Sequence, residues 1–347
     1  MKAKRLAALV LAGALCLSAF TGCGIDANET VATLGEQKVS AGIANFMSKY
    51  QKASVDDIYT AYYGTNVWQM DLSGSGETLE ESLKASVMDT IHDLYTLKAH
   101  MADYKVTLTE EDEKKIDEAV AAFLADNSKD ALKELGATED IVKEMLTLYT
   151  IQWKMHEAII ADTDRKVSDE EANMRGISYI AISKSGYYND KGSYVAFTSD
   201  EKTKLKDTVK KMEEALADKK LEDVAKEYDY KVTDDAYAKD DTGFDTTLLK
   251  AMDALKEGEV SKLVDTTSTY YFVRIDEDTD EKATEENKET IIEKRENELY
   301  TKVLDGWQKE DGWTVDEKVL AKIDFHHVLT QTDPNKSESE SVESTEK

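Results

Sequence analysis

Histidine side chains are the first candidates for metal or acid–base chemistry, and this chain of 347 residues holds five of them. They are His92, His100, His156, His326 and His327. His92 and His100 fall on one predicted helix about 12 Å apart, which is too far for both to bind one metal ion. His156 lies on the apolar stripe of another predicted helix, and His326 and His327 would point to opposite faces of a strand. The spacing predicts no zinc site and no metal cofactor.

The carboxylates of Asp276, Asp278 and Asp280 have the alternate spacing with which a calcium loop begins. Position six of such a loop would be Glu281 instead of glycine, and position twelve would be Asn287 instead of glutamate. A solvated acidic turn is the better interpretation. The sequence holds no Gly-x-Ser-x-Gly motif and no glycine-rich phosphate loop, so no chemistry of those kinds is predicted.

Cys23 is the residue best placed for a covalent modification. A basic start is followed by the apolar stretch Leu6–Leu17, which is too short to span a bilayer, and Gly22 stands directly before the cysteine. This order resembles a bacterial lipobox, which implies that residues 1–22 are a signal peptide, that Cys23 is lipidated and that residues 23–30 form a tether. The protein is then expected at the extracytoplasmic face of the bacterial cell membrane, anchored by lipid. The alternative is an ordinary cleaved signal peptide with a coincidental cysteine.

The formal net charge of −28 limits the classes of partner. An acidic surface repels phosphate backbones and anionic head groups, so nucleic-acid binding and electrostatic membrane binding are not expected. A solvated acidic surface is the simplest interpretation, and basic clients are a hypothesis. Because Cys16 leaves with the leader and Cys23 would carry lipid, the mature chain has no cysteine pair for a disulfide. The single proline, Pro334, lies near the C-terminus, which favours long helices elsewhere.

Helical periodicity dominates residues 40–162. Val31–Val39 predicts a strand–turn–strand, and Ser40 is placed to cap the helix that follows. A loop is expected near Ser73–Gly76, and Thr109 with its acidic neighbours predicts another helix start. Two sets of apolar residues keep helical spacing. They are Leu83, Val87, Ile91 and Leu94, and then Val142, Leu146, Tyr149, Trp153 and Ile160.

Strands and helices alternate from about residue 166. The pattern predicts strands over 176–182, 229–237 and 270–275, and helices over 205–216, 221–228 and 246–255. This β-α-α-β-α-β order describes a compact α+β domain whose sheet is covered mainly on one side. A helix returns over Thr284–Leu304, and the Ser/Glu-rich stretch 330–347 is expected to be disordered.

Short motifs in this part of the chain resemble parvulin-type prolyl isomerases of the PpiC class. Lys220–Tyr228 is similar to the end of the family's long helix, and Leu255–Ser261 is similar to the turn before its last strand. Asp240–Phe244 occupies the position of the family's glycine-rich loop. Val31–Val39, with Ser40 and the predicted helix, resembles the start of the chaperone domain in PrsA/SurA-like extracytoplasmic foldases. The resemblance covers most of the mature chain.

This resemblance implies a fold class and a domain layout. The fold is expected to be α+β, with a mostly helical SurA-like chaperone domain and an inserted parvulin-like domain. Residues 31–165 would form the chaperone domain, residues 166–280 the parvulin-like domain, and residues 281–329 a helix and segment that return to the chaperone domain. Apolar grooves between the helices would bind unfolded, newly translocated polypeptides.

The histidine pair shared by active parvulins is absent from this chain. Alignment of the first and last strands places Tyr179 and Tyr271 at the two positions, and no histidine occurs between residues 157 and 325. Core aromatics on strands are the simpler interpretation of these tyrosines. The expected function is a lipid-anchored chaperone or foldase with a catalytically inactive parvulin domain and no cofactor.

Three alternatives stay open. Tyrosine hydroxyls can hydrogen-bond a twisted prolyl amide, so the protein could be an active peptidyl-prolyl cis–trans isomerase. It could also be a surface scaffold or adhesin lipoprotein. A solute-binding lipoprotein usually needs two α/β lobes around a cleft, and only one small sheet is predicted.

Overall fold

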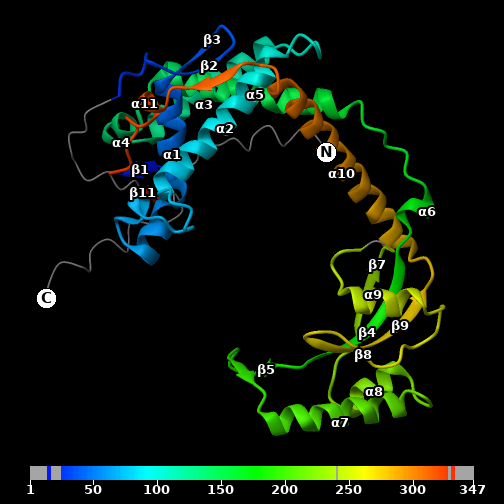
Figure 1. Ribbon diagram of the computed structural model, residues 1–347. Helices are drawn as coiled ribbons and strands as arrows, with labels where there is room; N and C mark the ends of the chain where they lie inside the picture. The colour runs from blue at the N-terminus through cyan, green and yellow to red at the C-terminus, as the bar shows by residue number, and fades with distance from the viewer. Residues whose placement is uncertain (1–13, 17–24, 240, 327–329, 333–347) are drawn as a thin grey trace, which may run out of the picture. The chain divides into compact units, whose positions relative to one another are not determined.

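The computed structural model describes residues 14–16, 25–239, 241–326 and 330–332 (Figure 1). The chain forms two compact units. The first unit contains residues up to Asp162 together with residues from Asn297 onward, and the second contains Thr163–Glu296. Cys23, the residue expected to carry lipid, and most of the leader lie outside the described residues.

A small antiparallel sheet closes one end of the first unit. Its strands are β2 (Thr30–Leu34), β3 (Gln37–Ser40) and β10 (Trp313–Val315), in the order β10-β2-β3. The predicted strand–turn–strand is therefore confirmed. The Ser40 hydroxyl accepts a hydrogen bond from the amide of Ile43, so Ser40 caps the first helix as predicted. The third strand comes from near the C-terminus and pairs with β2 through Trp313 opposite Leu34.

Helices make up most of the first unit, and residues with hydroxyl side chains cap the long ones. They are α1 (Ala41–Tyr63), η2 (Val67–Gln69), α2 (Leu79–Ala99), α3 (Glu110–Asp126), α4 (Lys129–Leu135), α5 (Glu139–Ile160) and α11 (Glu317–Leu320). Thr109 and Asp112 form a capping box at the start of α3, as the sequence predicts. One expectation is wrong: Trp153 is exposed instead of continuing the apolar stripe of α5, since the buried face passes through Ile151 and Met155.

The second unit carries a four-stranded antiparallel sheet in the order β7-β4-β9-β8. Its strands are β4 (Arg175–Ser183), β7 (Thr233–Tyr237), β8 (Val264–Asp265) and β9 (Thr269–Glu277). Its helices are α6 (Asp169–Ala172), α7 (Ser199–Ala215), α8 (Leu221–Glu227) and α9 (Thr246–Asp253). The predicted β-α-α-β-α-β order and the α+β fold class are confirmed. The sequence did not predict the hairpin of β5 (Gly186–Tyr188) and β6 (Tyr194–Ala196) between β4 and α7.

Both faces of this sheet are covered, which corrects the expectation of cover mainly on one side. Ile180 of β4 and Phe272 of β9 pack with α7 and α8. Ile177 of β4 and Val273 of β9 pack on the other face with α9. Because successive strand residues point to opposite faces, an uninterrupted apolar run such as 270–273 requires cover on both sides.

The turn Leu255–Ser261, which carries part of the family resemblance, lies beside β9. Gly258 adopts a φ of 79°, a left-handed conformation that favours glycine. Its amide donates to the carbonyl of Ile275 at 2.7 Å, and Val260 forms an isolated bridge with Arg274. The turn therefore adds backbone hydrogen bonds to β9.

The return helix is longer than predicted. It is α10 (Glu281–Gln308), whose residues 281–296 belong to the second unit and residues 297–308 to the first. The stretch 330–347 was expected to be disordered, but Thr330–Thr332 form β11, which pairs with β1 (Ala14–Cys16). Residues 333–347 lie outside the described residues. Within the residues that the structure describes, no helix combines the length and apolar character needed to cross a bilayer.

Candidate functional site

Tyr179 and Tyr271, the two positions predicted from the parvulin resemblance, lie together on the sheet of the second unit. Tyr179 is on β4 opposite Val273, and Tyr271 is on the adjacent strand β9 opposite Ala181. This register puts both rings on the same face, with centroids 5.9 Å apart and ring planes at 63°. The edge-to-face arrangement is one that aromatic pairs prefer.

The surroundings of this pair are half apolar and half open. Both rings are half-buried and pack against the cluster that contains Leu248 and Met252 of α9. Among the described residues, no hydrogen bond reaches either phenol oxygen. Burial raises the pKa of Tyr179, and Asp235 and Tyr271 raise it further, so Tyr179 is neutral at physiological pH. The pair can offer hydroxyl hydrogen bonds in a partly desolvated place.

A polar network that sequence reasoning missed lies on the opposite face of the sheet. Ser178, which is buried, hydrogen-bonds Asp234 at 3.0 Å and also contacts Asp276. Arg274 bonds Asp276 and reaches Glu222 of α8 at 2.6 Å. The network ties β4, β7, β9 and α8 together, and its members are too far apart in sequence for any local pattern to reveal it.

Aromatic side chains in the first unit form a continuous series from the core to the surface. Its members, named here the aromatic chain, are Phe325, Trp68, Tyr59, Tyr63 and Tyr62. The ring centroids of Phe325 and Trp68 are 5.3 Å apart, and those of Trp68 and Tyr59 are 5.7 Å apart. Tyr59 then stacks on Tyr63 at 6.4 Å, and Tyr63 contacts Tyr62. Phe325 and Trp68 are buried, whereas Tyr62 is 81% exposed.

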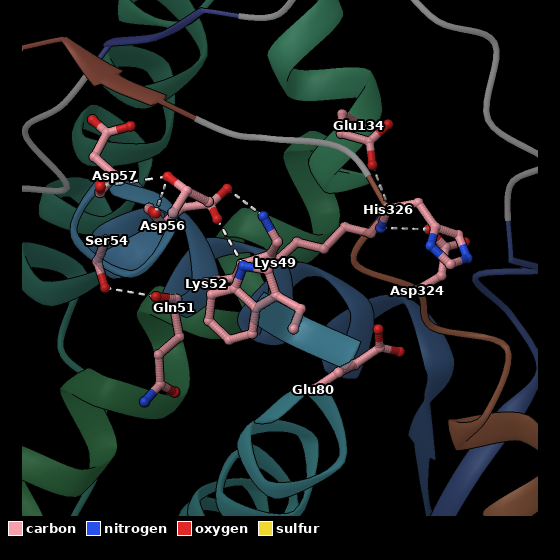
Figure 2. Close-up of polar contacts among 12 residues, drawn as sticks. Lys49, Gln51, Lys52, Ser54, Asp56, Asp57, Glu80, Glu134, Asp324 and His326 are labelled. Carbon is pink, nitrogen blue, oxygen red and sulfur yellow. Dashed lines mark hydrogen bonds and ion pairs between the residues drawn. The ribbon is translucent and has the colours of Figure 1, made fainter. Parts of the chain in front are cut away.

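A buried ion pair fixes the inner end of the aromatic chain. Lys52 and Asp56 lie one turn apart on α1 and point toward each other (Figure 2), with exposed side-chain fractions of 1% and 0%. The indole Nε1 of Trp68 donates to Asp56 at 2.7 Å, and the Lys52 ammonium lies 5.2 Å from the Trp68 ring. Burial lowers the pKa of Lys52, while Asp56 opposes that shift. These contacts hold η2 against α1.

The outer end of the aromatic chain is part of an exposed apolar surface, named here the α1 patch. It consists of Ile58, Tyr62 and Tyr63 on α1, and Met70 and Leu72, which follow in the next loop, are exposed as well. Ile58 is 61% exposed and Tyr63 is 54% exposed. Sequence reasoning missed this patch because it sought buried stripes. The spacing of Ile58, Tyr59, Tyr62 and Tyr63 on one predicted helix was the available signal.

Three of the histidines take structural places within the first unit. His326, expected on a strand, is exposed and lies outside the strands, and His327 lies outside the described residues. The His92 ring stacks on Trp313 at 4.5 Å, and its Nε2 lies 2.7 Å from Asp311. The His100 ring stacks on Trp307 at 4.1 Å. His156 is half-buried beside Tyr300, with the ring centroids 4.8 Å apart. In the described parts of the chain, no group of His, Cys, Asp or Glu has the arrangement of a metal site.

Comparison with known families identifies one domain. The family model of the PPIC-type PPIASE domain matches residues 184–289. Tyr271 and the Leu255–Ser261 turn lie inside this match, whereas Tyr179 precedes it.

Curated relatives match nearly the full chain. The foldase protein PrsA of Clostridium botulinum strain 657 is 26% identical over 358 aligned residues, which cover 92% of this chain and 99% of that protein. PrsA of the Okra strain is 25% identical with the same coverage.

Solved structures with similarity to this chain carry related names. Foldase protein PrsA from Lactococcus lactis aligns with a TM-score of 0.32 and 15% identity, covering 85% of this chain and 97% of that one. PrsA from Bacillus subtilis aligns with a TM-score of 0.23 and 21% identity, covering 71% and 86%.

Proposed function

Since the chain is a PrsA-like foldase with a parvulin-type domain, we propose that it is a membrane-anchored extracytoplasmic chaperone that binds unfolded, newly secreted polypeptides. The α1 patch is the observation that carries the proposal. Its apolar side chains are exposed, and two of them, Tyr62 and Tyr63, are connected through the aromatic chain to Trp68, which the buried Lys52–Asp56 pair contacts. Exposed apolar patches on soluble proteins mark interaction sites.

Unfolded polypeptides fit the α1 patch because their apolar side chains are exposed and adaptable. Tyrosine contributes large contact area at a small cost in conformational entropy and adds a hydroxyl for the backbone of the client. An unfolded client loses entropy when it binds, so each contact is expected to be weak and reversible. Weak contacts suit a chaperone that must release its client.

The layout of domains and the anchor belong to the same proposal. Residues 31–165 and 281–329 would make up the chaperone domain, with the parvulin-like domain inserted over residues 166–280. The first part of α10, residues 281–296, clusters with the second unit, so α10 would connect the two domains. Lipid on Cys23 would hold the protein at the extracytoplasmic face of the membrane, where secreted chains emerge unfolded.

The parvulin-like domain is proposed to be catalytically inactive. The absence of histidine between residues 157 and 325 supports this. An active isomerase is the second candidate, and the closeness of the two half-buried tyrosines favours it. A protease-coupled assay on a proline-containing peptide separates the two. Turnover that the Tyr179→Phe/Tyr271→Phe variant abolishes would establish the second candidate.

The chaperone proposal is tested by aggregation of a secreted enzyme diluted from urea, followed by light scattering. The wild-type mature chain is expected to suppress the scattering. The variant Ile58→Ser/Tyr62→Ser/Tyr63→Ser is expected to weaken client binding by about tenfold or more, because each lost side chain removes apolar contact worth about 1 kcal/mol or more.

The hairpin of the second unit provides a matched control. Tyr187, Tyr188 and Tyr194 are exposed to a similar degree, at 49%, 74% and 50%. The variant Tyr187→Ser/Tyr188→Ser/Tyr194→Ser therefore removes a similar amount of exposed apolar surface and should suppress aggregation like the wild type. Equal loss in both variants would contradict a client site at the α1 patch.

A further inference from the structure

A groove in the first unit has an apolar floor, and none of its floor residues belongs to the aromatic chain. It lies between α2, β10 and α11 and has a volume of about 760 Å³. Met88 of α2 and Leu320 of α11 form the buried part of its floor, and Trp313 and Val315 of β10 are half-buried there. The volume falls within the range of about 300–1,000 Å³ that is typical of ligand sites.

Carboxylates surround this apolar floor. The lining includes Glu77, Glu80, Glu81, Asp89 and Glu317, and its one cation among the described lining residues is Lys84. The Lys84 ammonium is already engaged, because it donates to Glu80 at 2.9 Å and to the carbonyl of Ile323 at 3.0 Å. Glu81 is also engaged, because it completes the capping box with Thr78.

Three of the five carboxylates keep their charge available for a ligand. Glu77, Asp89 and Glu317 are exposed, and the described residues place no ion pair or side-chain hydrogen bond on them. Three uncompensated negative charges around an apolar floor attract a ligand that carries positive charge beside apolar groups.

We propose that this groove binds an extended peptide segment in which apolar side chains alternate with lysine or arginine. The apolar side chains would contact Met88, Trp313 and Leu320, while the cationic ends would meet Glu77, Asp89 and Glu317. The groove shares no lining residue with the α1 patch, although Gln69 of its lining adjoins Met70 in the chain, and it would add a charge preference to the recognition of clients. The inference rests on the proposed chaperone function only for the origin of the segment, an unfolded secreted polypeptide.

The contribution of the three carboxylates to peptide affinity follows from their exposure to solvent. Exposed ion pairs contribute modestly, and three of them together correspond to a change in affinity of roughly three- to a hundredfold. Salt screens exposed charges, with a Debye length of about 10 Å at 0.1 M ionic strength, so binding should weaken as salt is added. The apolar contacts should persist at high salt.

The test measures fluorescence anisotropy of a labelled peptide that alternates lysine and phenylalanine, titrated with the full mature chain. The variant Glu77→Gln/Asp89→Asn/Glu317→Gln is expected to lose about tenfold in affinity at low salt. Ala85→Trp, which fills the groove from an exposed position on α2, is expected to weaken binding at both low and high salt. A peptide with glutamate in place of lysine should not bind the wild type.

The control is a second triple variant with the same change in charge. Glu36→Gln/Asp130→Asn/Glu157→Gln alters exposed carboxylates of the same unit that do not line the groove and form no ion pair among the described residues. It should bind the peptide like the wild type. An equal loss in this control would assign the effect to the overall charge, and wild-type affinity in Ala85→Trp would exclude the groove; either result overturns the proposal.

Two further measurements keep the outcome specific. Sedimentation should show the same oligomeric state for the wild type and Ala85→Trp, since a dimer lost in the variant would assign the groove to a second copy and overturn the proposal. The aggregation assay with the α1 patch variant is independent of the peptide titration. Failure of the chaperone function and failure of the groove proposal are therefore distinguishable.

Discussion

The buried pair of Lys52 and Asp56 allows a sharp test of how the α1 patch is held. The variant Lys52→Met removes the ammonium and leaves the Asp56 carboxylate in a site that is 0% exposed. Breaking a buried ion pair by removing one partner costs about 3–5 kcal/mol in the free energy of unfolding, because the other charge is left in a medium of low dielectric constant. The loss is a large fraction of the stability of an ordinary domain.

The double variant Lys52→Met/Asp56→Asn should recover most of that loss. It removes both charges, and the amide oxygen of asparagine can still accept the hydrogen bond that Trp68 Nε1 now donates to Asp56 at 2.7 Å. We expect the double variant to lie within about 2 kcal/mol of the wild type, since neutral replacements of buried pairs are often well tolerated. The resulting coupling energy between the two sites is then above about 1 kcal/mol.

The chain offers both a probe and a matched control for this experiment. All four tryptophans, at positions 68, 153, 307 and 313, lie in the first unit, so tryptophan fluorescence during urea unfolding reports on that unit. Lys114 and Glu118 form a pair with the same one-turn spacing, with exposed fractions of 76% and 66%. Lys114→Met should cost less than about 1 kcal/mol. Equal effects of Lys52→Met and Lys114→Met would refute the reasoning from burial.

Three further predictions follow from single residues. Burial would raise the pKa of Asp112, but hydrogen bonds from Lys154 and Thr109 outweigh it and hold that pKa at about 2, below the ordinary 3.8. Because the folded-state pKa is depressed, the Asp112 carboxylate stabilises the fold above pH 4 by about 1–2 kcal/mol after allowance for solvent screening, and this contribution is lost as the pH falls toward 2. In urea unfolding at a series of pH values, Asp112→Asn should reduce the loss of unfolding free energy between pH 4 and pH 2. The same loss in the variant and the wild type would contradict this prediction. Gly186→Ala should open the β5–β6 hairpin, because its Cβ would lie 2.2 Å from the carbonyl oxygen of Val195, and hydrogen exchange of the hairpin amides should rise. Cys23→Ser should move the protein from the membrane fraction to the soluble fraction of cells, whereas retention in the membrane would contradict lipid anchoring.

Local signals in the sequence predicted most of the elements. Ser40 and Thr109 are N-caps that act within three residues, so their helix starts could be placed from the sequence alone. The pairing of β10 with β2 could not be placed, because its partners lie at opposite ends of the chain and no local pattern joins them. The apolar run 270–273 indicated that both faces of the second sheet are covered, but we expected cover mainly on one side.

The candidate sites also differ in whether the sequence alone could place their residues. Tyr179 and Tyr271 were placed on two strands by the parvulin resemblance, the structure brings those strands together, and the two tyrosines stay candidate positions. The aromatic chain could not, because Phe325 reaches Trp68 only through the folding of the first unit. The groove between α2, β10 and α11 also depends on tertiary structure, because Asp89 of α2 and Glu317 of α11 line it together. An excess of acidic residues in the sequence indicates charge but not where a ligand would meet it.

The central claim is that this protein binds unfolded clients without catalysing prolyl isomerisation. The most direct measurement is the refolding of a secreted client whose slow phase is limited by proline isomerisation, with the rate and the aggregation followed in the same sample. The slow-phase rate is expected to be unchanged while aggregation is suppressed. A slow phase that accelerates and saturates with client concentration would contradict it and would assign catalysis to the Tyr179–Tyr271 site.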